Sequence, residues 1–336
     1  MPNNDPSIIT PERFREKINK AQRDSVVNFG LYFAVTPDSL PHLQELAPHV
    51  IAFKLFMGES TGGINYPYDR LTEAFEAVAK TGKLLCVHAE DQEILDQGKE
   101  EYRSQFSPIN HLLARPPRAE VEAIKYALEL SYQYGVPLHI CHVTTRDGID
   151  FIREAKGNGF NVTAETCPHY LFMDFYDLIK LGSYAKMNPP LRCYDDQEEL
   201  WKGLVDRTID WIASDHAPHT REEKDKGLNN IWLAPGGVPG VETTSPLMLN
   251  AVNKKRLSLQ QLVELMHDNP VARFGLDRYG YVEEGNVANM TIVNLEKPWK
   301  IRDEELSTKC GWSPYNGWTG RGAPVGVVIN GKYYEL

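Results

Sequence analysis

The sequence lacks the features that mark several large classes of protein. No apolar run approaches the ~18 residues of a membrane-spanning helix, and the N-terminus has no basic region followed by an apolar core. Long lysine or arginine runs are absent, and the formal net charge is −10. Membranes and nucleic acids are therefore disfavoured as partners. We expect a cytoplasmic protein that acts on a small molecule.

Cysteine is scarce and scattered. The five cysteines are odd in number and include no Cys-x-x-Cys pair. This pattern predicts neither a disulfide framework nor a zinc site made of thiolates alone.

Six short apolar runs predict buried parallel strands. They alternate with amphipathic segments, such as the helix expected after Thr10 and Pro11 and another that ends at Gly135. This alternation is typical of an α/β barrel or a doubly wound sheet. The runs are 28–35, 50–57, 83–90, 136–144, 160–167 and 209–218.

Reactive residues favour the barrel over the doubly wound sheet. Four of the runs carry a titratable residue within or at the end of the strand: Lys54, His88, His142 and Asp215. In a barrel the carboxyl ends of the strands converge on one mouth, where such residues meet. We therefore predict a barrel over residues 1–280. Short β-runs and the Asn-Gly pair at 330–331 predict a small β appendage over 281–336.

Lys54 lies within the apolar stretch AFKLFMG. Burial favours the neutral amine, which can react with carbon dioxide to form a carbamate that bridges two metal ions. The alternative is a lysine that extends from the strand end to solvent.

His88 and His142 each end a strand, where imidazole can bind a metal or serve as a hydrogen-bonded core residue. His139 lies three residues before His142, so strand alternation predicts the opposite face and a structural role.

The stretch IASDHAPHT places Asp215 at the end of an apolar strand, where a carboxylate needs a partner such as a metal or a substrate proton. The alternative is an aspartate that caps the next helix. His219 can point back toward the mouth, whereas His216 alternates away from Asp215.

Seven stretches occur in the order and approximate spacing of one known family. They are AFKLFMG, LLCVHAED, HICHVTT, AETCPHYL, KMNPPLR, IASDHAPHT and GGVPGVET. The chain thus resembles the cyclic amidohydrolases, and the dihydroorotases most closely. CPHYL is closer to allantoinases and hydantoinases, so an allantoinase or dihydropyrimidinase type of activity stays open.

The resemblance implies a TIM-like (β/α)₈ barrel with two zinc ions and carbon dioxide held as a carbamate on Lys54. His88 and His142 would bind one zinc, and Asp215 would bind the other and act as the catalytic acid/base. The substrate would be carbamoyl aspartate or dihydroorotate. Its binding residues would be Asn3, Asn188, His219, Gly236 and Gly237.

One family feature is absent, because the chain contains no His-x-His pair. In the family this pair lies on the first strand and binds one zinc. We therefore expect a barrel that is N-terminally incomplete, without the first strand and most of the second. The explanations are a truncated sequence, a non-catalytic dihydroorotase-like subunit, or a strand supplied by another chain. Such a barrel exposes sheet edges, so we expect one incomplete metal site and a homo-oligomer.

Overall fold

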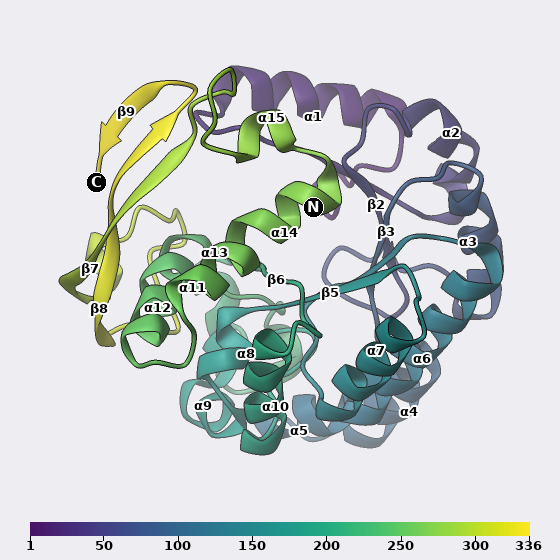
Figure 1. The fold of residues 1–336 in the computed structure, drawn as a ribbon. Helices are drawn as coiled ribbons and strands as arrows, with labels where there is room; N and C mark the ends of the chain where they lie inside the picture. Colours follow the sequence, from purple (N-terminus) through teal and green to yellow (C-terminus); the bar gives the residue numbers. More distant parts are fainter.

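A six-stranded parallel sheet forms the centre of the fold in the computed structural model, which describes residues 1–336 (Figure 1). Its strands pair in chain order, and one strand lies within each of the six apolar runs, so these six predictions are confirmed. The strands are β1 (Tyr32–Ala34), β2 (Ala52–Phe56), β3 (Leu85–His88), β4 (Leu138–Ile140), β5 (Val162–Thr166) and β6 (Trp211–Ile212).

The sheet is a row of six strands, whereas the family resemblance implies eight. β1 and β6 are its edges, and no hydrogen-bonded pairing joins them. Phe274, at the end of α14 (Asn269–Phe274), contacts Tyr32 on β1 with ring centroids 6.4 Å apart and Trp211 on β6 with centroids 5.7 Å apart. An aromatic side chain therefore packs between the two edge strands. That the barrel lacks its first strand and most of its second stays a prediction.

Helices connect the strands and lie outside the sheet (Figure 1). The expected helix starts and stops are confirmed at two of them. Thr10 accepts a hydrogen bond from the Arg13 N–H at the start of α1, and Gly135 ends α6 with φ 68°. The helices before β6 are α1 (Pro11–Asp24), α2 (Leu43–Leu46), α3 (Leu71–Ala79), α4 (Gln92–Tyr102), α5 (Pro108–Ala114), α6 (Pro117–Tyr134), α7 (Arg146–Gly157), α8 (Pro168–Phe172), α9 (Phe175–Leu181) and α10 (Tyr194–Val205).

The remaining helices follow β6. None of the helices in the structure combines the length and apolarity that crossing a membrane requires. These helices are α11 (Arg221–Asp225), α12 (Val241–Asn253), α13 (Leu259–Val263), α14 and α15 (Asp277–Gly280).

The register of the sheet separates two buried sides. Lys54 pairs with Cys86, and Cys86 pairs with His139, so these three residues lie at one level and on one side. Their sequence neighbours Phe53 and Leu85 belong to the large apolar core on the other side, against the helices. Burial on both sides explains why the strand sequences are almost continuously apolar.

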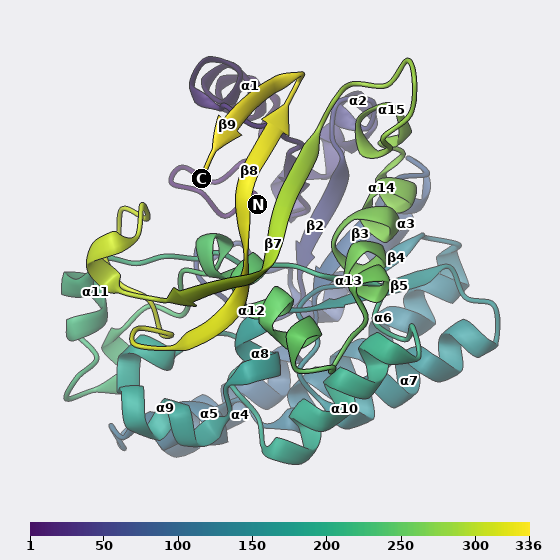
Figure 2. The same cartoon turned by 60° about the vertical axis from the view of Figure 1, so that its left-hand side comes forward.

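The C-terminal segment forms an antiparallel sheet beside α12 (Figure 2). Its strands are β7 (Met290–Lys300), β8 (Thr319–Ile329) and β9 (Lys332–Glu335). The expected hairpin is confirmed, because Asn330 and Gly331 join β8 to β9 with φ of 50° and 81°. The boundary between 280 and 281 as a domain limit stays a prediction.

Candidate active site

A cavity of about 250 Å³ opens at the carboxyl ends of the parallel strands. Eight of the nine residues predicted to bind metal or substrate line it, although their positions span most of the chain. The ninth, Lys54, is fully buried beside it. The lining includes Phe56 and Thr61, and it contains no lysine or arginine side chain. The eight are Asn3, His88, His142, Asn188, Asp215, His219, Gly236 and Gly237.

His88 and His142 face each other in the wall of this cavity. His88 Nδ1 lies 3.1 Å from His142 Nε2, and the two side chains are almost fully buried. Burial lowers the pKa of each imidazole, so each is neutral and can offer a lone pair to a cation. His142 Nδ1 is buried without a hydrogen-bond partner. Imidazole nitrogens are among the ligands that zinc prefers, with Zn–N bonds of about 2.0–2.1 Å. The two facing ring nitrogens could therefore supply two ligands to one zinc ion.

Glu90 and Arg115 support His88, and sequence analysis missed both. Glu90 Oε2 accepts a hydrogen bond from His88 Nε2 at 2.8 Å, which leaves Nδ1 free to face His142. Burial disfavours the Glu90 carboxylate, but Arg115 at 2.5 Å and His88 outweigh this and hold the pKa of Glu90 far below its usual range. The available signal was the position of Glu90 two residues after His88, on the same strand face.

Lys54 is buried and does not extend to solvent, so that alternative is wrong. Its Nζ donates a hydrogen bond to Cys141 Sγ at 2.9 Å and lies 5.1 Å from the centroid of the Phe56 ring. Burial favours the neutral amine of Lys54, as expected, but neighbouring groups oppose this effect. Burial lowers the pKa of Lys54, but Cys141 and Glu165 raise it by more, so the pKa lies above its ordinary value.

Asp215 lines the cavity and accepts no hydrogen bond in the structure. Burial, with a smaller contribution from Glu165, raises the pKa of Asp215 to about 6. Its backbone has φ 40°, and His142 has φ 41°, a conformation that costs energy and that often marks functional sites. The helix-cap alternative is wrong, because Thr220 caps the next helix, α11.

The loop that carries Gly236 and Gly237 is held by buried lysines. Lys224 Nζ donates to the carbonyl oxygens of Pro235 and Gly237 at 3.0 and 2.9 Å. Lys186 Nζ donates to the carbonyl of Ala234 at 2.6 Å. Burial lowers the pKa of Lys224 to about 7 and that of Lys186 to about 8. These contacts fix the backbone at one side of the cavity.

The other predicted substrate-binding residues surround that loop. His219 Nε2 lies 3.2 Å from the Gly236 carbonyl, and Asn188 Oδ1 is buried without a hydrogen-bond partner. Asn3 donates to the Thr61 carbonyl at 3.3 Å. Amide and imidazole groups thus reach the cavity from three separate segments.

His139 requires a correction. It is structural as expected, but it does not lie on the outer side of the sheet. It shares the inner side with Lys54, stacks on Trp211 with ring centroids 4.0 Å apart, and lies 3.2 Å from Glu165. The alternation argument fails because β4 ends at Ile140 and the positive φ of His142 redirects the chain.

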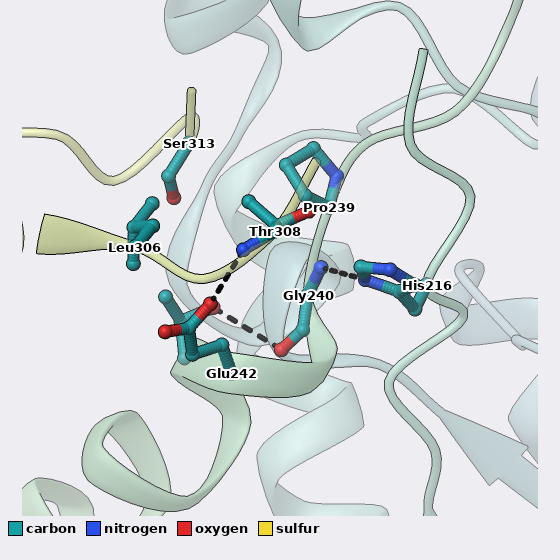
Figure 3. A pocket seen from close by; sticks show the side chains of 8 residues that line it. His216, Pro239, Gly240, Glu242, Leu306, Thr308 and Ser313 are labelled. Carbon is teal, nitrogen blue, oxygen red and sulfur yellow. Dashed lines mark hydrogen bonds between the residues drawn. The ribbon is translucent and has the colours of Figure 1, made fainter. Parts of the chain in front are cut away.

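His216 contacts the backbone before α12 and also lines the cavity together with Asp215. That its side chain alternates away from Asp215 stays a prediction. His216 Nδ1 accepts a hydrogen bond from the N–H of Gly240 at 3.1 Å, just before α12 (Figure 3). The space beside it is only about 10 Å³. In Figure 3 the Glu242 side chain points to the backbone of Thr308, and it accepts the Thr308 N–H at 3.2 Å. These contacts attach the start of α12 to the segment between β7 and β8, and the small space beside His216 leaves no room for a ligand.

The segment 307–318, which precedes β8 and has no role predictable from its sequence, packs against residues near the cavity. Trp312 is 1% exposed and belongs to the main apolar core. Its indole N–H donates to the His219 carbonyl at 2.7 Å, and its ring lies 5.7 Å from Lys224 Nζ. Trp312 therefore contacts both His219, a predicted substrate-binding residue, and Lys224, which holds the loop of Gly236 and Gly237.

Comparison with known proteins agrees with this architecture. Residues 17–333 match the amidohydrolase family. A dihydroorotase from Methanosarcina acetivorans is 39% identical over 327 residues, 94% of this chain and 69% of that protein. A dihydroorotase from Pyrococcus furiosus is 35% identical over 332 residues, 99% of this chain and 71% of that protein.

A solved structure of L-hydantoinase (dihydropyrimidinase) from Arthrobacter aurescens matches with a TM-score of 0.96 at 32% identity, over 100% of this chain and 77% of that one. The chain belongs to the amidohydrolase family. The predicted class, a hydrolase that acts on cyclic amides, is confirmed, and so is the resemblance to dihydroorotases.

Proposed function

We propose that this chain catalyses the dihydroorotase reaction, the reversible interconversion of carbamoyl aspartate and dihydroorotate in pyrimidine biosynthesis. Relatives named dihydroorotase that are 34–39% identical support this activity. The observation that carries the proposal is the convergence of His88, His142 and Asp215 on one cavity with Lys54 buried beside it.

The residues fit one zinc ion well and a second one only in part. Lys54 as a carbamate, His88 and His142 would hold the first, since the two imidazoles already face each other. Of the ligands that the family resemblance implies for the second, only Asp215 and the carbamate are available, because the chain has no His-x-His pair. When bound, zinc supplies Lewis-acid polarisation of the ring carbonyl and lowers the pKa of water.

Asp215 would act as the catalytic acid/base. A pKa of about 6 lets this carboxyl accept a proton from the attacking water and donate it to the departing ring nitrogen near neutral pH. Asp215 lines the cavity in which the substrate would bind.

Substrate would be oriented by neutral groups. Asn3, Asn188 and His219 offer hydrogen bonds for the substrate carboxylate and ring, and the backbone at Gly236 and Gly237 offers others. Hydrogen bonds from these groups would hold the substrate in one orientation, which reduces the entropy that is lost on reaching the transition state.

A hydantoinase or dihydropyrimidinase type of activity is the second candidate. The TM-score of 0.96 to the Arthrobacter L-hydantoinase favours it. The two candidates share the ring-opening chemistry and differ in whether the ring carries a carboxylate. The predicted non-catalytic role would leave the chain without either activity.

The deciding experiment assays the purified chain with zinc and bicarbonate against dihydroorotate, hydantoin and dihydrouracil. We expect ring opening of dihydroorotate, and a loss of at least about 10²-fold in kcat for Asp215→Asn, which removes the proton carrier. Asp195→Asn, an exposed position on α10, is the matched control and should keep full activity. Preference for hydantoin would favour the second candidate. A folded, zinc-loaded chain without turnover would favour the non-catalytic role.

A further inference from the structure

Two buried lysines behind the loop of Gly236 and Gly237 have no acidic partner. Lys224 is 0% exposed and Lys186 is 7% exposed. Each Nζ atom donates hydrogen bonds only to backbone carbonyl oxygens. Buried charges are usually paired with an opposite charge, because an isolated one is costly to remove from water. The acceptors are the carbonyls of Lys186, Pro235 and Gly237 for Lys224, and those of Ile231 and Ala234 for Lys186.

The hydrogen bonds of Lys224 require the charged form of its amine. Its Nζ has three carbonyl acceptors, at 3.2, 3.0 and 2.9 Å, and only the ammonium form of a lysine has three N–H donors. Burial, and then repulsion from Lys186, lower the pKa of Lys224 to about 7, and Glu223 opposes them only in part. The fold therefore holds a positive charge here at a cost, which an anion on the far side of the loop would reduce.

A peptide group of the loop connects this charge to the cavity. Lys224 Nζ binds the Pro235 carbonyl at 3.0 Å. The C=O and N–H groups of a trans peptide point in opposite directions, so the Gly236 N–H points away from Lys224. This N–H donates no hydrogen bond within the protein, and Gly236 lines the cavity. An anion that accepted this N–H would complete a row of hydrogen bonds in which the ammonium polarises the peptide.

The same charge acts on His219, another residue of the cavity wall. Burial, and then the charge of Lys224, lower the pKa of His219, so its imidazole is neutral near pH 7. A neutral imidazole can donate a hydrogen bond to an anion but supplies no charge. The positive charge on this side of the cavity therefore comes from the lysines behind the loop.

Two other largely buried cations contrast with this pair, because each has a carboxylate partner. Arg192 lies 3.7 Å from Glu120, and Lys156 lies 2.6 Å from Asp210. Those ion pairs neutralise themselves inside the fold. Charge that stays unpaired beside a ligand cavity indicates instead that the ligand carries the opposite charge.

We propose that Lys224 and Lys186 determine specificity, because their charge selects a ring substrate that carries a carboxylate. Neither side chain lines the cavity, so both act through the loop of Gly236 and Gly237 as positioning residues. A neutral ring gains nothing from this charge. The inference rests on the proposed function, since it states which class of cyclic amide the same cavity takes.

Binding of orotate and of uracil tests this selection without any turnover. The two rings differ only in the carboxylate, and neither is the saturated ring that the reaction opens. In calorimetric titrations of the full, zinc-loaded chain, we expect orotate to bind at least about tenfold more tightly than uracil. Lys224→Gln, which removes the charge but keeps two N–H donors, should weaken orotate binding about tenfold and leave uracil binding unchanged. Lys226→Gln, an exposed position beside it, is the matched control and should change neither.

Lys224→Met separates the charge from the hydrogen bonds, because methionine has no donor for the loop carbonyls. We expect this variant and Lys224→Gln to lose orotate binding to a similar extent. Full orotate binding in Lys224→Gln would overturn the proposal, because the donors alone would then be sufficient. Equal weakening of both rings would also overturn it and would leave Lys224 as a structural support of the loop.

Lys186→Gln covers the case in which the Lys224 variants do not fold, and it should show the same selective loss of orotate binding. A Lys186→Gln chain that binds both rings as the unmodified chain does would refute the role of the pair. These measurements are independent of turnover. A chain that selects orotate through these lysines but opens no ring would support this inference and refute the proposed dihydroorotase activity.

Discussion

Replacement of Glu90 by glutamine tests whether the buried carboxylate orients His88. Glu90→Gln keeps the size of the side chain but removes the charge that binds Arg115 and His88 Nε2. Removing one partner of a buried ion pair costs about 3–5 kcal/mol. Arg115 is 13% exposed and also donates to the Glu59 carbonyl at 2.6 Å, so we expect the lower end, about 3 kcal/mol.

The same change should weaken metal binding. Loss of a carboxylate that orients a metal-binding histidine reduces affinity by about 10–100-fold. Urea unfolding measures the stability, and competition with a chelator measures the zinc affinity. Glu93→Gln, an exposed position on α4, is the control and should change neither. Reduced stability with unchanged zinc affinity would refute the orienting role and leave Glu90 as a structural ion-pair partner.

Three further predictions concern the supports of the cavity. Trp312→Ala should lower the free energy of unfolding by about 3–5 kcal/mol in urea titrations. Gly237→Ala should raise KM, because φ is 135° and the added Cβ would lie 2.5 Å from the Ala217 carbonyl oxygen. The pKa of His139 is lowered by burial but raised overall to about 9, chiefly by Glu165. Its stabilising charge is complete below pH about 6.5 and is lost as pH rises through 9, so unfolding free energy should fall by about 3 kcal/mol over that range.

The sequence predicts the strands and most of the cavity because both follow from local patterns. Apolar runs bounded by turn residues locate β1–β6, and parallel strands bring their carboxyl ends together. His88 and Asp215 could therefore be placed near each other although 127 positions separate them along the chain. Gly236 and Gly237 could be predicted as substrate-binding residues only from the family resemblance, because no local sequence pattern shows that a loop packs against a distant strand.

What the sequence could not predict depends on contacts between distant segments. Strand alternation put His139 on the wrong side because the sequence does not show that β4 ends at Ile140. The charge of Lys54 depends on Cys141 and Glu165, which approach it from other strands. Trp312 reaches His219 across 93 positions, so its role becomes visible only in the fold.

The positions of the expected metal-binding residues depend on the register of the sheet. Lys54 pairs with Cys86, and Phe56 pairs with His88, so β2 and β3 set the level of two of the expected metal-binding residues. A slip of one residue between these strands would turn His88 toward the helices and bring Val87 into the cavity. That slip would also expose Leu85 and its neighbours to the polar interior. The apolar core outside the sheet therefore holds the donor atoms in place, and the site and the core are stabilised by the same register.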